Sequence, residues 1–352
     1  MRDFVYDQLP VRVVFAAGAF ERLADEAARL GLSKLLVLST PGQAKLGEDA
    51  LRRLGPRALA LHAEAKMHVP VETAQAARAK ARALGADGAV AIGGGSTIGL
   101  GKAIALETGL PIIAVPTTYA GSEMTPIHGL TEGGLKRTGR DPKVLPRTAI
   151  YDPLLTLGLP PKISGPSGMN AIAHCVEALY ADNANPVTSL MAEEGIRALA
   201  HSLPRIASDP SDRAARGDAL YGAWLAGISL GAVGMALHHK LCHTLGGSFN
   251  LPHAETHTIV LPHATAYNAN AAPDAMSRIA RSLGAADAAR GLYDLAARIG
   301  APLALKDIGL KEQDLDRAAQ IATQNPYFNP RPVTRDGVRR LLEDAFQGRR
   351  PA

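Results

Sequence analysis

Residues 88–118, GAVAIGGGSTIGLGKAIALETGLPIIAVPTT, decide the fold class. The segment begins with an apolar run at 88–92, continues through a glycine run into a helical pattern that ends near Thr108, and closes with a second apolar run at 111–115. Two strands joined by a helix of about ten or more residues are typical of a parallel βαβ unit. The sequence therefore predicts an α/β domain whose ligands bind at the carboxyl ends of the strands.

The same alternation extends on both sides of this unit and stops near residue 152. We expect further strands at 11–15, 34–39 and 144–151, helices at 19–30, 45–54 and 71–84, and a hairpin at 127–140 with Gly133 and Gly134 at its centre. After Pro153 the pattern is helical without strands. Helices are expected at 165–181, 187–202, 211–238 with a break, 275–283, 287–299, 312–323 and 334–347. We predict two domains: a nucleotide-binding α/β domain at residues 1–152 and an all-α domain at residues 153–352.

The composition excludes several classes of protein. The net charge of +5 comes from scattered Lys and Arg residues without interleaved aromatic residues, so we expect no nucleic-acid partner. The two cysteines, Cys175 and Cys242, cannot form a disulfide framework, and both lie in helical patterns that favour buried structural thiols. The N-terminus lacks the apolar region of a signal peptide, and no apolar run reaches the length of a membrane span. We therefore expect a cytoplasmic enzyme with no membrane partner.

The glycine run between the first two apolar segments predicts a phosphate site. Its residues are Gly93, Gly94, Gly95, Ser96 and Thr97, with a helix that starts near Ser96 or Thr97. Glycines allow the backbone to approach a ligand closely, and a helix N-terminus offers free N–H groups to an anion. The alternative is a tight strand-to-helix turn capped by Ser96. The position between a strand and a helix favours a pyrophosphate site, although neither the spaced GxGxxG fingerprint nor a P-loop is present.

Two further loops follow strands of the same predicted sheet. The first places hydroxyl groups beside the glycine run, where they can bind a diphosphate, a ribose or a nicotinamide amide; its candidates are Thr117, Thr118, Tyr119 and Ser122. The second follows the strand at 34–39 and reads Ser39-Thr40-Pro41. In dinucleotide folds an acidic residue at this point binds the ribose and repels a 2′-phosphate. Because no acid is present, the sequence leaves both NADH and NADPH open.

Six of the eleven histidines lie within residues 234–268. His239 and His243 are four residues apart, which places both on one face of a helix that we expect to stop at Gly246 and Gly247. His253 follows a turn around Pro252. On an earlier helix, Asn170 and His174 also share one face; alone they would indicate a structural hydrogen bond. Together with His239, His243 and His253 they form a candidate polar site.

These segments, in this order, resemble the iron-containing (group III) alcohol dehydrogenase superfamily. The resemblance covers nearly the whole chain, and it implies a Rossmann-like N-terminal domain, an all-α C-terminal domain as in dehydroquinate synthase-like proteins, and a homodimer. The usual metal ligands of the family are an Asp and a His four residues apart, followed by two more His. They correspond here to Asn170, His174, His239 and His253, while His243 matches a histidine near the nicotinamide.

Asn170 departs from that pattern, because a neutral amide does not supply the anionic oxygen that a hard or borderline divalent cation favours. With HHKLCHTLGGSFNLPHAE, PTTYAGSEMT and the late Asn329-Pro330-Arg331-Pro332, the chain is similar to the maleylacetate reductases. That resemblance implies reduction of maleylacetate to 3-oxoadipate with NADH or NADPH, in the breakdown of aromatic compounds and without a metal. Gly99, where metal-dependent relatives commonly carry Asp, agrees with this interpretation.

The expected roles follow from the chemistry of a conjugated ketone. His243 is the first choice for the proton donor, with His253 as its partner. Lys240 and Arg331 are candidates for binding the two substrate carboxylates, although most Lys and Arg residues are only solvated surface charges. Asn170, His174 and His239 are expected to orient the substrate, with Asn170 and His174 hydrogen-bonded to each other. His238, His257 and His263 are expected to be structural or surface residues.

Three other functions remain open at this stage. The first is a metal-dependent alcohol or polyol dehydrogenase that binds iron or zinc on the same scaffold. The second is a lyase similar to dehydroquinate synthase, which would require a metal and more basic residues. The third is a nucleotide-binding protein without catalytic activity.

Overall fold

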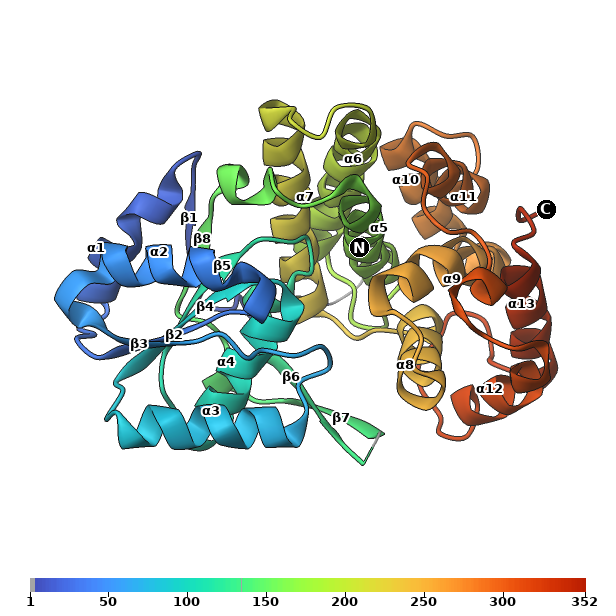
Figure 1. Cartoon of the computed structure of the whole chain (residues 1–352). Coiled ribbons are helices and arrows are strands. Elements are labelled where there is room, and N and C mark those ends of the chain that lie inside the picture. The colour runs from blue at the N-terminus through green and yellow to red at the C-terminus, as the bar shows by residue number, and fades with distance from the viewer. Residues whose placement is uncertain (1–3, 134) are drawn as a thin grey trace. The chain divides into compact units, whose positions relative to one another are not determined.

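The computed structural model describes residues 4–133 and 135–352, which form two compact units (Figure 1). One unit is Gln8–Leu159; the other is Pro160–Ala352, to which residues 4–7 also belong. Residues 1–3 of the predicted first domain, and Gly134 of the predicted hairpin, lie outside the described residues. The predicted architecture, an α/β part followed by an all-α part, is confirmed.

The unit Gln8–Leu159 contains a six-stranded sheet in which every pair of neighbouring strands is parallel, in the order β1-β8-β5-β4-β2-β3. The strands are β1 (Arg12–Phe15), β2 (Leu35–Leu38), β3 (Ala58–His62), β4 (Gly88–Gly93), β5 (Ile112–Pro116) and β8 (Thr148–Tyr151). The sequence analysis missed β3. Its sequence, ALALH, is half-buried at the edge of the sheet, and alanine and leucine give little strand signal.

Helices cover both faces of this sheet (Figure 1): α1 (Leu23–Arg29), α2 (Ala44–Leu54), α3 (Val71–Ala83) and α4 (Gly95–Thr108). Because side chains alternate along a strand, Leu36 and Ala91 pack with α3 and α4, whereas Val37 and Val90 pack with α1 and α2. Strands buried on both faces are continuously apolar, which is why LLVL at β2 carries no polar alternation. A separate antiparallel hairpin, β6 (Ile127–Glu132) with β7 (Leu135–Arg140), follows β5 as predicted.

The strand order reverses between β2 and β4. From β2 the chain moves outward to β3, then returns to β4 on the other side of β2 and continues to β5. In open α/β sheets a ligand crevice forms outside the carboxyl ends of the strands at such a reversal. The two loops that flank it begin at Ser39 and at Gly93, which are both candidates from the sequence.

The unit Pro160–Ala352 is helical, and the structure, which describes all of these residues, contains no strand there. Its helices are α5 (Pro161–Leu179), α6 (Pro186–Ser208), α7 (Arg213–Ala232), α8 (Leu237–Phe249), α9 (His253–Asn268), α10 (Pro273–Leu283), α11 (Ala288–Arg298), α12 (Leu315–Ala322) and α13 (Arg335–Gln347). The sequence analysis missed α9, because its β-branched residues and the internal Pro262 obscure the helical pattern. In the described chain no single helix is long and apolar enough to cross a membrane; α7 and α8, bent by 96°, meet that test only as a pair.

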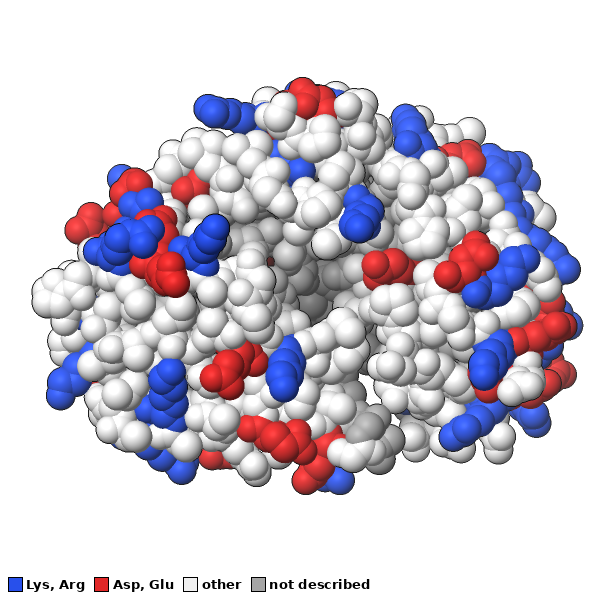
Figure 2. All heavy atoms as spheres, in the orientation of Figure 1, with Lys and Arg blue, Asp and Glu red and all other residues white. Residues whose placement is uncertain are grey.

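Charges are mixed on the face of the protein that Figure 2 draws. On the face drawn in Figure 2, Lys and Arg side chains alternate with Asp and Glu, and no stripe of one sign forms. This distribution agrees with the scattered charge of the sequence, and it lacks the basic stripe of a nucleic-acid-binding surface.

The end of α8 differs from the prediction. Gly246 and Gly247 do not stop the helix, which continues to Phe249, and Asn250 instead adopts a left-handed conformation with φ 55°. Asparagine tolerates this conformation because its short polar side chain relieves part of the steric cost. The turn at Asn250 then leads through Pro252 into α9, and so determines where His253 begins the next helix.

We predict different effects for two substitutions at this turn. Asn250→Val should lower the free energy of unfolding by about 1–2 kcal/mol, because a β-branched residue is strained in the left-handed region. Asn250→Gly is the matched control and should leave the stability near that of the wild type. Calorimetric unfolding temperatures would compare the two variants; equal temperatures would show that the turn tolerates any residue.

Candidate active site

The glycine loop requires glycine at Gly93 and is tightly packed at Gly94. Gly93 has φ 151°, and a Cβ there would lie 2.5 Å from Thr97 Oγ1. A Cβ on Gly94 would lie 3.0 Å from Thr118 Cγ2, so the two predicted loops approach each other at this point. Helix α4 begins at Gly95 without a side-chain cap and without an acidic residue in its first turn. Its N-terminal amides therefore remain suited to an anion.

Gln43 connects the loops around this site, and the sequence analysis missed it. Its Nε2 donates to Thr117 Oγ1 at 2.8 Å, and Thr40 Oγ1 lies 3.5 Å from its Oε1. A Cβ on Gly93 would also meet Gln43 Oε1, at 2.8 Å. The only signal in the sequence was its position three residues after Thr40. That signal is weak, because polar residues are common next to loops. The remaining candidates lie as follows: Ser39 and Tyr119 are buried, Ser96 is half-buried in the first turn of α4, and Ser122 opens a short 3-10 turn.

A buried lysine anchors α4 to the hairpin. Lys102 Nζ donates to the backbone oxygens of Thr125 and Ile127, at 2.8 and 2.7 Å, and to Thr125 Oγ1 at 2.9 Å. Burial lowers the pKa of Lys102 to about 7. The lysine therefore fixes the start of the hairpin and does not face the glycine loop as a P-loop lysine would.

In the helical unit, the histidine site is built by α5, α8 and α9. Helix α5 carries Asn170 and His174, α8 carries His239 and His243, and α9 begins with His253. The imidazole ring of His239 is central: its centroid lies 5.2 Å from that of His174 and 6.1 Å from that of His243. The rings of His253 and His257 are tilted by 55° with centroids 4.3 Å apart, and the His257 ring lies 5.0 Å from that of His239. The four predicted histidines of this unit therefore gather near the start of α8.

Glu177 on α5 holds that helix start in place. Its carboxylate is fully buried and accepts hydrogen bonds from the backbone amides of Ala236 and His238, each at 2.8 Å. His239 Nδ1 donates to the same carboxylate at 2.7 Å. A negative charge at a helix N-terminus satisfies free amides and the helix dipole together. No role was predicted for Glu177; its spacing of three from His174 was the available signal.

Three polar atoms around His239 are buried without a hydrogen-bond partner: Asn170 Oδ1, His174 Nδ1 and His239 Nε2. The expected hydrogen bond between Asn170 and His174 is therefore not formed through these atoms. Because Glu177 occupies Nδ1 of His239, its Nε2 remains available to a ligand. Buried polar atoms without partners are costly, so this set is suited to a polar ligand.

His238, His257 and His263 are buried rather than on the surface. His238 Nε2 lies 3.0 Å from His257 Nδ1. Burial, and then the neighbouring histidines, hold the pKa of His238 and of His257 well below the ordinary value, so both rings are neutral. Burial and the same neighbours lower the pKa of His174 in the same way. Burial lowers the pKa of His263 to about 4.

The two basic candidates for substrate binding lie against aromatic rings. Lys240 Nζ lies 5.8 Å from the centre of the Tyr327 ring. The Arg331 guanidinium stacks 4.3 Å over Tyr267 and donates to its backbone oxygen at 3.3 Å. The loop that carries Arg331 is fixed by a reciprocal pair of amide hydrogen bonds between Asn329 and Asn268. The loop is therefore rigidly attached to the end of α9.

Comparison with known proteins identifies the family. The model of the iron-containing alcohol dehydrogenases matches residues 10–153, and that of the C-terminal part of the Fe-containing alcohol dehydrogenase family matches residues 165–346. The chain is 58% identical to a maleylacetate reductase from Burkholderia cepacia, over 352 residues that span all of both chains. This protein belongs to the maleylacetate reductase family. Like its iron-containing alcohol dehydrogenase relatives it is an oxidoreductase.

Solved structures of the family support the same assignment. The crystal structure of maleylacetate reductase from Agrobacterium tumefaciens superposes with a TM-score of 0.96 at 54% identity and 100% coverage of both chains. Sulfoacetaldehyde reductase from Bifidobacterium kashiwanohense, solved in complex with NAD+, superposes with a TM-score of 0.90 at 25% identity, over 98% of this chain and 99% of that one.

The name of the superfamily implies a bound iron ion. The residues of this chain at the corresponding position are poorly suited to bind it. The imidazole part of a metal site is retained, including the carboxylate that orients His239 from behind, as in many metal-binding histidines. The anionic ligand is not retained, because Asn170 is neutral and Glu177 is bonded to the amides of α8. A hard or borderline cation such as Fe²⁺ favours that missing oxygen. We therefore derive no step of the mechanism through a metal.

We predict that Glu177→Gln lowers the free energy of unfolding by about 1–3 kcal/mol, because the charge-assisted hydrogen bonds to α8 weaken in a buried site. Glu194→Gln is the matched control; it loses only a surface pair with Arg197 and should change stability by less than about 1 kcal/mol. Thermal unfolding of the two variants tests this directly. Equal small shifts would mean that the Glu177 charge does not stabilise α8.

Proposed function

We propose that this protein reduces maleylacetate to 3-oxoadipate with NADH or NADPH, in the degradation of aromatic compounds and without a metal ion. The observation that carries the proposal is the 58% identity to the Burkholderia cepacia maleylacetate reductase over the whole of both chains. The neutral Asn170, in place of the anionic ligand of metal-dependent relatives, supports the absence of a metal.

The nucleotide is assigned to the unit Gln8–Leu159. Its pyrophosphate would bind at Gly93–Gly95 and at the first amides of α4, where the strand order reverses. Ribose and nicotinamide contacts are assigned to the surrounding hydroxyls of Ser39, Thr40, Ser96, Thr97, Thr117, Thr118, Tyr119 and Ser122. The absence of an acid after β2 supports acceptance of both NADH and NADPH. The NAD+ complex of sulfoacetaldehyde reductase supports nucleotide binding by this fold.

The reaction is a conjugate reduction. Hydride from the nicotinamide forms a C–H bond at the alkene carbon β to the ketone, and the alkene π electrons move toward the ketone oxygen to give an enolate. A proton then reaches the α carbon, which yields 3-oxoadipate and the oxidised nucleotide. Because negative charge develops on the ketone oxygen, hydrogen-bond donors placed there lower the barrier.

His243 is proposed as the proton donor, with His253 as its partner. His243 is exposed and His253 half-buried, whereas His174, His238, His239 and His257 are buried. A general acid must be reprotonated in every catalytic cycle, and an exposed imidazole exchanges protons with water readily. Exposure therefore favours His243 over the buried rings of the same cluster.

The dicarboxylate substrate is assigned to the polar atoms around His239. Asn170, His174 and His239 are proposed to orient the ketone or a carboxylate, because each presents a buried atom without a partner. Lys240 and Arg331 are proposed to attract the carboxylates. Arg331 can take this role while it remains stacked on Tyr267, because its guanidinium still has N–H donors for a carboxylate.

We also propose a cytoplasmic homodimer, as the family resemblance implies. Light scattering of the purified protein would measure the mass of the assembly directly.

The deciding assay is the oxidation of NADH, and separately of NADPH, upon addition of maleylacetate, with and without EDTA. We expect rapid oxidation of at least one nucleotide, unchanged after chelation and extensive dialysis. Protein purified without a His tag avoids metal introduced by the tag. Activity lost on chelation and restored by iron or zinc would instead support the metal-dependent dehydrogenase, and no nucleotide oxidation would support a non-redox protein.

We predict that His243→Ala retains NADH affinity and loses about 10²–10⁴-fold in kcat, the usual contribution of general acid catalysis. His201→Ala is the matched control, because His201 is an exposed histidine on α6 beside Arg205. Steady-state kinetics and NADH fluorescence titration would separate turnover from binding. Turnover within a few-fold of the wild type would assign the proton donor elsewhere.

A further inference from the structure

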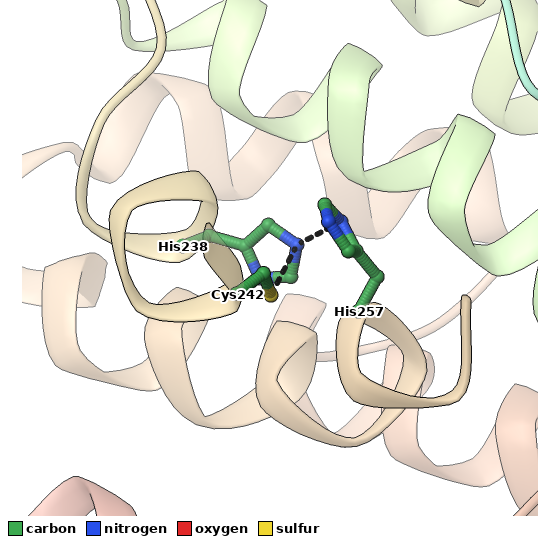
Figure 3. A group of neighbouring side chains, drawn as sticks. All are labelled: His238, Cys242 and His257. Atoms are coloured by element: carbon green, nitrogen blue, oxygen red, sulfur yellow. Dashed lines mark hydrogen bonds between the residues drawn. The ribbon is translucent and has the colours of Figure 1, made fainter. Parts of the chain in front are cut away.

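We propose that His238, Cys242 and His257 form a buried binding site for one borderline or soft divalent cation, of which zinc is the best match (Figure 3). This site is separate from the positions that bind metal in the iron-containing relatives, which correspond here to Asn170, His174, His239 and His253. It does not depend on the proposed reaction.

The three side chains converge from two helices. His238 and Cys242 lie one turn apart on α8, and His257 lies on α9, one turn after His253. One ligand atom from each residue lies within 4.8 Å of the other two. Figure 3 shows one ring nitrogen of His238 facing both the His257 ring and the Cys242 sulfur. All three residues are almost fully buried, with exposed fractions of 0%, 1% and 0%.

The separations are close to those of a metal site. Bonds of about 2.0–2.1 Å to nitrogen and 2.3 Å to sulfur require tetrahedral ligands separated by roughly 3.4 Å between two nitrogens and 3.6 Å between nitrogen and sulfur. His238 Nε2 lies 3.0 Å from His257 Nδ1 and 3.7 Å from Cys242 Sγ. A cation would need the two rings to separate by a few tenths of an ångström, and it would need Cys242 Sγ, which lies within 4.8 Å of the His257 ligand atom, to lie at about 3.6 Å from it.

The donor types and the local charge select the cation. Two imidazoles and a thiolate suit zinc and exclude magnesium and calcium, which take oxygen ligands. A divalent cation with one thiolate has a net charge of +1. The Glu177 carboxylate, which bonds the backbone amide of His238 at 2.8 Å, supplies a compensating negative charge within the same buried region. Balanced charge makes burial of the ion feasible.

The alternative is a hydrogen-bonded histidine pair without a cation. In that arrangement one imidazole donates to the other, and Cys242 remains a thiol. His238 Nδ1 and His257 Nε2 have no partner in either case, so the outer nitrogens do not distinguish the two states. Cys242 does distinguish the two states, because its sulfur is a bonded thiolate only when a metal is present.

The test is metal binding by the full-length protein, without a His tag, after growth with added zinc or cobalt and after desalting. Elemental analysis should find about one equivalent per chain, and Co²⁺ should produce the near-ultraviolet charge-transfer band of a cobalt–thiolate bond. Cys242→Ser should reduce the metal content per chain and the intensity of the cobalt–thiolate band by about tenfold or more. Cys175→Ser, which removes the other buried cysteine, should leave the metal content and the band unchanged.

His174→Ala distinguishes the proposed site from the position that binds metal in the iron-containing relatives. It removes a ligand of that position and leaves His238, Cys242 and His257 in place. Cobalt–thiolate absorption that survives His174→Ala and disappears in Cys242→Ser supports the proposal. The absence of binding in the wild type, or binding that depends on His174 and not on Cys242, overturns it.

A folding defect in Cys242→Ser is controlled by a second measurement. Zinc should raise the unfolding temperature of the wild type and of Cys175→Ser, and should leave that of Cys242→Ser and His257→Gln unchanged. A zinc-dependent increase in either of the last two variants would also overturn the proposal.

Discussion

The buried Glu177 carboxylate is the constraint on which the helical site depends. It satisfies the free amides at the start of α8 and holds the Nδ1 side of His239, so that backbone geometry and imidazole orientation are fixed by one group. Substitution by a neutral residue would leave several buried donors with weaker partners, in a region where water cannot replace them. Histidines at the start of a helix are ordinarily mobile at χ1 and χ2, and this carboxylate removes that freedom for the central ring.

Replacement of the anionic ligand by Asn170 changes the electrostatics of the site more than its shape. The imidazole frame persists around His239, while the charge that would stabilise a dication at that point is missing. The polar atoms of this set can instead hold a ligand by hydrogen bonds. His243 is the exposed member of this set, and its ring centroid lies 6.1 Å from that of the buried His239.

The sequence best predicted those features that depend on a local pattern of residues. The βαβ pattern, the glycine loop after β4 and the i, i+4 histidines on α8 were predictable, because period and spacing determine them. It was least informative where an element depends on distant partners. Strand β3 is Ala-rich and acquires its strand character from pairing with β2, α9 is helical despite Pro262, and α8 passes through two glycines to Asn250. Glu177 and Gln43 act on groups 59–62 and 74 residues away, which no local pattern reveals.

The packing of Gly99 on α4 links it to a strained residue in the loop before α3. A Cβ at this position would lie 2.8 Å from Val69 Cγ2, and Val69 itself adopts a positive φ of 48°. A β-branched residue is strained in this region of backbone conformation, so Val69 is held there by the surrounding structure. The two positions are therefore coupled: a side chain at position 99 requires a compensating shift or a smaller residue at position 69.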